Sequence, residues 1–127
     1  KKHGGCPTGE ARITTAGNLK SKYVIHTVGP IYGRHDDNEP NLLYNAYYNS
    51  LKLAGDYKLN SISFPSISTR AYGYPIKEAV KVVISAVKDF LDEYSEIKEI
   101  DFILFNEEDY GFYCEYFSDY PDFKVKA

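Results

Sequence analysis

Two spacings of hydrophobic residues alternate along this 127-residue chain. Short apolar or β-branched runs at 10–15, 22–28, 61–65 and 100–105 predict strands. The runs at 22–28 and 100–105 are nearly continuous, which is typical of strands covered on both faces of a sheet. The first run is short and predicts an edge strand.

Three segments between and after these runs have the three- and four-residue spacing of amphipathic helices. Asp37 or Asn38 is a candidate N-cap for the first helix, which has Pro40 in its first turn and ends at Gly55. The second helix spans 75–94, and its apolar face consists of Ala79, Val82, Val83, Ala86, Val87, Phe90 and Leu91. The third runs from 106–109 to about Tyr120, with three acidic residues in its first turn.

The resulting order, β-β-α-β-α-β-α, is typical of a mostly parallel sheet covered by helices on both faces. The predicted fold class is therefore α/β, with three α/β/α layers. In such sheets, ligands bind at the carboxyl ends of the strands. The loops at 29–38, 66–74 and 105–109 all follow strands, so we expect them to converge on one site.

The loop at 66–74 connects a strand to the start of the second helix, which is a favourable place for an anion. The first backbone N–H groups of a helix have no intrahelical partner, and the helix dipole favours negative charge there. Ser68, Thr69 and Gly73 are small enough for a phosphate to approach the backbone. Pro75 suits the first helical position. The alternative interpretation is that these small residues serve turn geometry alone.

Net charge, the length of apolar runs and the cysteines exclude several classes of function. A net charge of −3 and a pI of about 5.6 argue against a broad basic surface for duplex nucleic acid. No run reaches the roughly 20 apolar residues of a membrane span. The only cysteines, Cys6 and Cys114, do not form a disulfide or zinc pattern. We therefore expect one cytoplasmic domain with no metal or cofactor.

The other side chains that could act in catalysis or metal binding have simpler structural interpretations. His26 lies within an apolar strand run, which predicts a hydrogen-bonded core histidine rather than a catalytic one. His3 and Cys6 have a metal-like spacing but make only half of a zinc site. Cys6 has no evident base that would activate it as a nucleophile.

Four segments together resemble the macrodomain family of ADP-ribose-binding α/β modules, in particular its ADP-ribosyl and O-acetyl-ADP-ribose hydrolases. They are Gly-Gly-Cys-Pro-Thr-Gly-Glu-Ala at 4–11, Tyr-Val-Ile-His-Thr-Val-Gly-Pro at 23–30, Phe-Pro-Ser-Ile-Ser-Thr at 64–69 with Tyr-Gly-Tyr-Pro at 72–75, and Phe-Asn-Glu-Glu-Asp at 105–109. They occur in the family's order and at about its spacing, so residues 1–127 are expected to form a single macrodomain unit.

The chain departs from the family's pattern in two ways. The resemblance implies an N-terminal third, with two strands and an Asp-bearing glycine-rich loop, that has no counterpart here. We therefore expect residues 1–127 to be the C-terminal two thirds of the domain, unless another segment fills the gap in the sheet. In addition, Arg70 occupies a position where the family usually has glycine. Its guanidinium would either grip a pyrophosphate or block its approach to the backbone.

The resemblance also implies a role for each site residue. The diphosphate and distal ribose would be bound by Ser68, Thr69, Arg70, Ala71, Tyr72 and Gly73. Tyr72 would orient the scissile group, while water would be held by the substrate phosphate and by Asp and Asn residues of the family's N-terminal loops. Phe105 and Asn106 would contact adenine and its ribose, although Phe105 is equally consistent with a core aromatic residue that closes a strand.

Three functions follow from the resemblance. The first is a hydrolase that removes ADP-ribose from acidic side chains of proteins or acetyl from O-acetyl-ADP-ribose. The second is a module that binds free or protein-linked ADP-ribose without turnover, and the third is an inactive fragment in which Arg70 fills the pocket. RNA binding is not favoured for this acidic chain.

Overall fold

The computed structural model describes residues 6–15, 23–69, 72–94, 97–104 and 107–117, together with the backbone of 124–126. The elements in order are β1 (Ala11–Thr15), β2 (Tyr23–Thr27), α1 (Glu39–Asp56), β3 (Ser61–Phe64), α2 (Ile76–Glu93), β4 (Glu99–Ile103), α3 (Glu107–Tyr116) and β5 (Lys124–Lys126).

This order confirms the predicted strands and helices, with bounds that differ mostly by one or two residues. Pro75 is the N-cap of α2, one position before the helix begins. Gly55 lies inside the last turn of α1 rather than beyond its end. The short strand β5 was not predicted, because three residues with two lysines do not have the hydrophobic pattern of a strand.

Within the described residues, the strands form two separate sheets. β1 and β2 pair in antiparallel register, with Ile13 opposite Ile25. β3, β4 and β5 form a parallel sheet in which β4 is central, and Phe64 lies opposite Phe102. The mostly parallel α/β fold is confirmed, but β2 and β3 are not hydrogen-bonded to each other.

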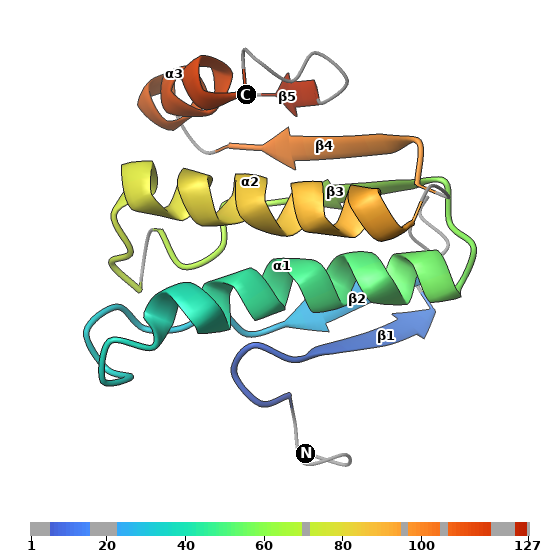
Figure 1. Ribbon diagram of the computed structural model, residues 1–127, viewed down its shortest axis with the longest axis horizontal. Helices are drawn as coiled ribbons and strands as arrows, with labels where there is room; N and C mark the ends of the chain where they lie inside the picture. Colours follow the sequence, from blue (N-terminus) through green and yellow to red (C-terminus); the bar gives the residue numbers. More distant parts are fainter. Residues whose placement is uncertain are drawn as a thin grey trace.

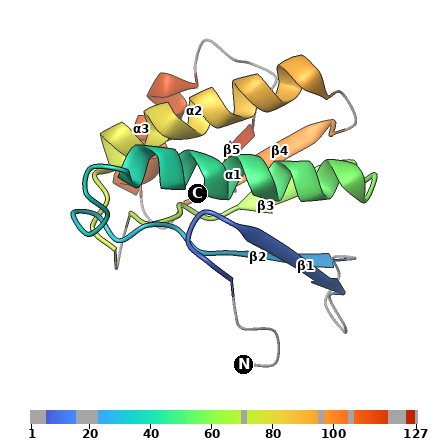
Figure 2. The same cartoon turned by 60° about the horizontal axis from the view of Figure 1, so that its bottom comes forward.

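The helices pack around one line of aromatic side chains. The Phe64 ring lies 4.9 Å from that of Tyr47 in α1 and 5.9 Å from that of Phe102, and the Phe102 ring lies 5.5 Å from that of Tyr113 in α3. Since Phe64 and Phe102 are register partners on one sheet face, α1 and α3 lie on that same face. Figures 1 and 2 show α2 alongside α1. The second helical layer is not among the described residues.

Strand β2 is less buried than its apolar sequence predicts. Its residues are half-buried, except for His26, which is exposed. The prediction that His26 is buried in the core is therefore wrong. The predicted hydrogen bond is present, because Nε2 of His26 lies 3.2 Å from Oγ1 of Thr14. This face of β2 also bears no described helix, since α1 packs on the side of Ile25.

The loops that follow β2 and β3 lie together at one end of the molecule. In Figure 1 the arrows of β2, β3 and β4 point toward the same side, where α1 and α2 begin. This arrangement places the segments 28–38 and 65–75 next to each other, as the sequence predicts. Of the third expected loop, at 105–109, residues 105 and 106 lie outside the described residues, and 107–109 form the first turn of α3.

Candidate functional site

One buried tyrosine of α1 forms hydrogen bonds to the backbone of the loop that follows β3. The Tyr47 hydroxyl accepts a hydrogen bond from the backbone N–H of Ile67 at 3.1 Å and donates one to the carbonyl of Pro65 at 3.4 Å. The side chain is only 1% exposed. Burial raises the pKa of Tyr47 well above its usual value of 10, so the hydroxyl keeps the proton that it donates.

Side chains and backbone inside the loop hold its next turn. The hydroxyls of Ser66 and Thr69 are 2.6 Å apart, and the Tyr74 N–H donates to the Ser68 carbonyl at 2.9 Å. These contacts hold residues 66–69 and Tyr74, on either side of Arg70 and Ala71, which lie outside the described residues.

Ser68 has the most unusual conformation in this turn. Its φ of 69° is in the left-handed region, which is rare for a residue other than glycine. Its hydroxyl oxygen is buried and has no hydrogen-bond partner among the described residues. A buried hydroxyl without a partner is unfavourable, so a ligand that supplies one would gain affinity at this position.

Gly29, in the loop after β2, approaches this turn too closely for any side chain. A Cβ atom at Gly29 would lie 2.2 Å from Oγ of Ser68 and 2.4 Å from Cγ2 of Ile67. The requirement for glycine is thus steric, and it fixes the distance between the two loops. Gly73 differs, because its φ of 73° favours glycine while the space around it is open.

A second contact joins the same two loops farther out. The Tyr32 N–H donates to the Tyr72 carbonyl at 2.9 Å, and the ring of Tyr32 packs edge-on against Tyr74 with centroids 5.0 Å apart. Tyr74 is buried, and desolvation together with Glu78 raises its pKa to about 12. The Tyr72 side chain is 38% exposed, so its ring is accessible at the rim of the site.

The loop that carries Tyr32 is anchored by a carboxylate at the start of α1. Glu39 is buried, and its Oε2 accepts the His35 N–H at 2.8 Å. This backbone hydrogen bond lowers the pKa of Glu39 below its usual 4.5, against desolvation, which raises it. Nε2 of His35 accepts the Ile31 N–H at 3.3 Å. The anchor holds a loop in which Gly33, Asp36 and Asp37 all have positive φ.

Four of the predicted site residues, Ser68, Thr69, Tyr72 and Gly73, are described and lie between β3 and α2, where the Tyr74 N–H donates to the Ser68 carbonyl. Arg70, Ala71, Phe105 and Asn106 lie outside the described residues, so their predicted roles stay predictions. Sequence reasoning missed Tyr47 and Gly29 as site-forming residues. An aromatic residue on the apolar face of a helix and a glycine after a strand have no sequence signal that distinguishes such roles from ordinary packing and turn formation.

Of the alternative chemical sites, the pair His3 and Cys6 stays untested, because His3 lies outside the described residues. Sγ of Cys6 lies 3.1 Å from the carbonyl of Glu10, which is a structural contact. In the described part of the chain there is no group of three or more His, Cys, Asp or Glu side chains that could hold a metal ion. None of the described helices has the length and apolar character needed to cross a membrane.

Comparisons with known proteins agree with this geometry. The family model described as "Macro domain" matches residues 1–83. A macro domain-containing protein of Caldanaerobacter subterraneus is 53% identical over 119 residues, which cover 94% of this chain and 67% of that protein. An O-acetyl-ADP-ribose deacetylase of Escherichia fergusonii is 44% identical over 113 residues, covering 89% of this chain and 64% of the deacetylase.

Solved structures are similar as well. A mutant macrodomain of Oceanobacillus iheyensis with ADP-ribose (ADPR) has a TM-score of 0.83 and 45% identity, and the match covers 89% of this chain and 60% of that one. The chain thus spans about two thirds of these relatives, or less.

Proposed function

The chain belongs to the Macro domain family, and we propose that the domain it helps to form binds ADP-ribose and hydrolyses ADP-ribosyl esters or O-acetyl-ADP-ribose. The observation that carries the proposal is the turn at 66–74. A hydrogen bond to Tyr47 holds its backbone at Ile67, it lies just before α2, and it contains the buried Ser68 hydroxyl, which lacks a partner among the described residues.

This turn suits a diphosphate for a physical reason. The N-terminal N–H groups of α2 and the neighbouring loop amides are donors in a region where the helix dipole favours negative charge. The buried Ser68 hydroxyl adds one donor that costs little to align, because it forms no competing hydrogen bond with the described residues. Tyr47 bonds to the backbone at Pro65 and Ile67, and the close approach of Gly29 restricts Ser68, so these parts of the loop lose little freedom when a ligand binds.

The remaining roles concern the two ends of the ligand. Tyr72, exposed at the rim, would contact the distal ribose and orient the scissile group, and Phe105 with Asn106 would contact adenine and its ribose. The proposal gives Arg70 the role of gripping the pyrophosphate, because a guanidinium matches phosphate oxygens well. Arg70→Gly should then weaken ADP-ribose binding, whereas tighter binding would indicate that Arg70 obstructs the site.

Support for hydrolysis comes from the relatives, since the 44% identical protein of Escherichia fergusonii is named an O-acetyl-ADP-ribose deacetylase. The second candidate is an ADP-ribose-binding module without turnover. What favours it is Arg70, which stands where the family usually has glycine. The catalytic water would be held by loops of the family that have no counterpart in residues 1–127.

One pair of measurements tests both candidates. Isothermal titration with ADP-ribose measures binding, and release of acetate from O-acetyl-ADP-ribose measures turnover. Binding with turnover supports the hydrolase, and binding without turnover supports the module. No binding by a well-folded domain that carries the family's N-terminal loops would contradict both.

We propose one macrodomain unit over residues 1–127, with ADP-ribose, ADP-ribosylated proteins or O-acetyl-ADP-ribose as partners. No cofactor is required, because the substrate phosphate and the protein supply the polar groups. A cytoplasmic location stays a prediction, in keeping with the free thiols of Cys6 and Cys114.

A further inference from the structure

Exposed apolar side chains gather on the two loops that Tyr32 and Tyr72 join. Among the described residues, five large hydrophobic side chains are exposed, and three of them, Ile31, Tyr32 and Tyr72, lie on these loops with exposed fractions of 39%, 43% and 38%. The Tyr32 N–H donates to the Tyr72 carbonyl at 2.9 Å, so the three residues lie on adjoining backbone segments. We call this group of three the rim patch. Single exposed apolar residues are common on proteins, whereas a group beside a candidate binding site is typical of a contact surface.

Contacts with buried residues hold the segment that carries Ile31 and Tyr32. The Tyr32 ring packs edge-on against that of Tyr74, which is only 3% exposed, with centroids 5.0 Å apart. The Ile31 N–H donates to Nε2 of His35 at 3.3 Å, and the His35 N–H donates to the buried Glu39. The exposed side chains are thus attached to backbone that is already hydrogen-bonded, which lowers the ordering cost for a partner that covers them.

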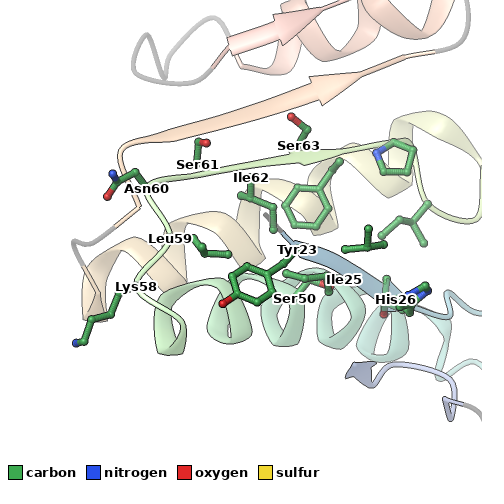
Figure 3. A pocket seen from close by; sticks show the side chains of 15 residues that line it. Tyr23, Ile25, His26, Ser50, Lys58, Leu59, Asn60, Ser61, Ile62 and Ser63 are labelled. Carbon is green, nitrogen blue, oxygen red and sulfur yellow. The ribbon is translucent and has the colours of Figure 1, made fainter. Parts of the chain in front are cut away.

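The rim patch is separate from the cavity between β2 and β3. That cavity has a volume of about 880 Å³ and is lined by strand residues such as Tyr23, Ile25 and Ile62 (Figure 3). None of the three residues of the rim patch lines it. The rim patch lies instead in the loops that follow β2 and β3, at the end of the molecule where α1 and α2 begin (Figure 1). Its neighbour there is the candidate ADP-ribose site.

We propose that the rim patch binds the polypeptide to which ADP-ribose is attached, so that protein-linked ADP-ribose is the preferred ligand of this site. The inference rests on the proposed function, in which Tyr72 contacts the distal ribose and orients the group attached to it. A polypeptide continues beyond that ribose and covers Ile31 and Tyr32, whereas the small acetyl group of O-acetyl-ADP-ribose ends close to Tyr72.

The chemistry of the rim patch specifies the polypeptide that it favours. Ile31, Tyr32 and Tyr72 bring no charge to the surface, so the affinity gained there comes from apolar side chains beside the modified residue. Tyrosine suits this role, because its ring covers apolar atoms while its hydroxyl bonds to peptide groups or water. The preferred ligand is therefore an ADP-ribosylated acidic residue with apolar neighbours in its own sequence.

The test uses a domain that contains this chain and the family's N-terminal strands, with three probes. They are free ADP-ribose, a short peptide that carries ADP-ribose on a glutamine side chain flanked by leucine and valine, and the same peptide without ADP-ribose. The amide link to glutamine replaces the ester and resists hydrolysis, so calorimetry measures binding alone. The modified peptide should bind about five- to tenfold more tightly than free ADP-ribose, because it buries the apolar area of the rim patch.

Tyr32→Ser removes the exposed ring and keeps the backbone N–H that bonds to Tyr72. This variant should lose most of the peptide's advantage and bind free ADP-ribose within about twofold of the unmodified domain. If Tyr32→Ser lowers the melting temperature, Ile31→Ser replaces it and should lose a smaller part of the advantage. An equal loss of affinity for free ADP-ribose and for the modified peptide would contradict the proposal, since Tyr32 would then act on ADP-ribose itself.

Tyr57→Ser is the matched control. Tyr57 is 47% exposed and is the C-cap of α1, whereas the rim patch lies at the end where α1 begins. The variant loses a ring of the same kind and of similar exposure, and it should keep the full advantage of the modified peptide over free ADP-ribose.

Four further results would contradict the proposal in distinguishable ways. Equal affinity for the modified peptide and free ADP-ribose would overturn it and leave the proposed function standing. Equal affinity for the peptide with and without ADP-ribose would also overturn it, because the surface would then act independently of the site. Dimerisation of the domain that Tyr32→Ser abolishes would show that a second copy covers the rim patch instead. No binding of free ADP-ribose or of the modified peptide would end the proposed function, and this proposal with it.

Discussion

The hydroxyl of Tyr47, in the middle of α1, lies 3.1 Å from the backbone nitrogen of Ile67, in the loop that begins α2. Twenty residues separate them in the chain. Through this bond and the one to Pro65, a core side chain determines where the backbone of the candidate phosphate loop runs. The loop is thus an extension of the core rather than an independent surface segment.

Tyr47→Phe removes both hydrogen bonds and leaves the ring in place. We expect a loss of about 1–3 kcal/mol of stability, because buried polar groups of the loop lose their partner. ADP-ribose affinity should fall several-fold as the loop relaxes. Tyr44→Phe is the control, since the Tyr44 hydroxyl bonds to Asp89 of α2 at 2.6 Å, away from the loop. Thermal melts and calorimetry of both variants check this, and equal loss of ADP-ribose affinity in the two would contradict it.

Gly29→Ala adds only one methyl group, but it should disrupt the site severely. The added Cβ would lie 2.2 Å from Oγ of Ser68, so the two loops must move apart. We expect a lower melting temperature and loss of measurable ADP-ribose binding. Gly111→Ala, in α3, has open space around the new methyl group. It should be neutral or raise stability by about 0.5–1 kcal/mol, as expected for glycine in a helix. Normal ADP-ribose binding by Gly29→Ala would refute the close-approach argument.

Ser68→Ala separates ligand binding from stability. The left-handed backbone conformation is kept in both residues, and the hydroxyl has no partner among the described residues. The melting temperature should therefore change little, or rise slightly because an unpartnered buried hydroxyl is removed. If the hydroxyl donates to a phosphate, affinity for ADP-ribose should fall about 10- to 100-fold, as for a hydrogen bond to a charged group. Unchanged affinity would remove Ser68 from the set of ligand contacts.

Acid should loosen the loop at 31–38 through Glu39. The His35 N–H lowers the pKa of Glu39 in the folded state, so the ionised form contributes stability above its unfolded value near 4.5. That contribution is lost as the pH falls through the lowered folded value. The difference in melting temperature between the unmodified chain and Glu39→Gln should therefore be largest near neutral pH and shrink in acid.

Glu10→Gln is the charge-matched control for that experiment. Glu10 is exposed and forms an ion pair with Arg12 at 2.8 Å, and pairs of this kind contribute little. The melting temperature of Glu10→Gln should equal that of the unmodified chain, within about a degree, at each pH. A Glu39→Gln difference that is constant from pH 7 to pH 3 would show that the carboxylate's charge does not matter.

The sequence predicts the fold well where periodicity is strong. The buried faces of α1 and α2 and the apolar run of β4 follow from spacing alone, and Val80 is the main buried residue of α2 that this reasoning missed. β5 was missed because parallel pairing with β4, a tertiary contact, makes a strand from a short polar segment. His26 was misjudged because an apolar run does not reveal which face of its strand is covered.

The site was predicted in part. Small residues before an amphipathic helix indicate an anion site, so Ser68, Thr69 and Gly73 could be found from their order in the chain. The support given by Tyr47 and the close approach of Gly29 could not, because each depends on contact between segments that are distant in the sequence.

The most direct test of the central claim is titration of ADP-ribose into a domain that contains this chain and the family's N-terminal strands, compared with its Ser68→Ala variant. We predict saturable binding at one site per chain and a clear loss of affinity in the variant without a fall in melting temperature. Absence of binding by the well-folded domain, or equal affinity of the two proteins, would contradict the assignment of the 66–74 turn as the ADP-ribose site.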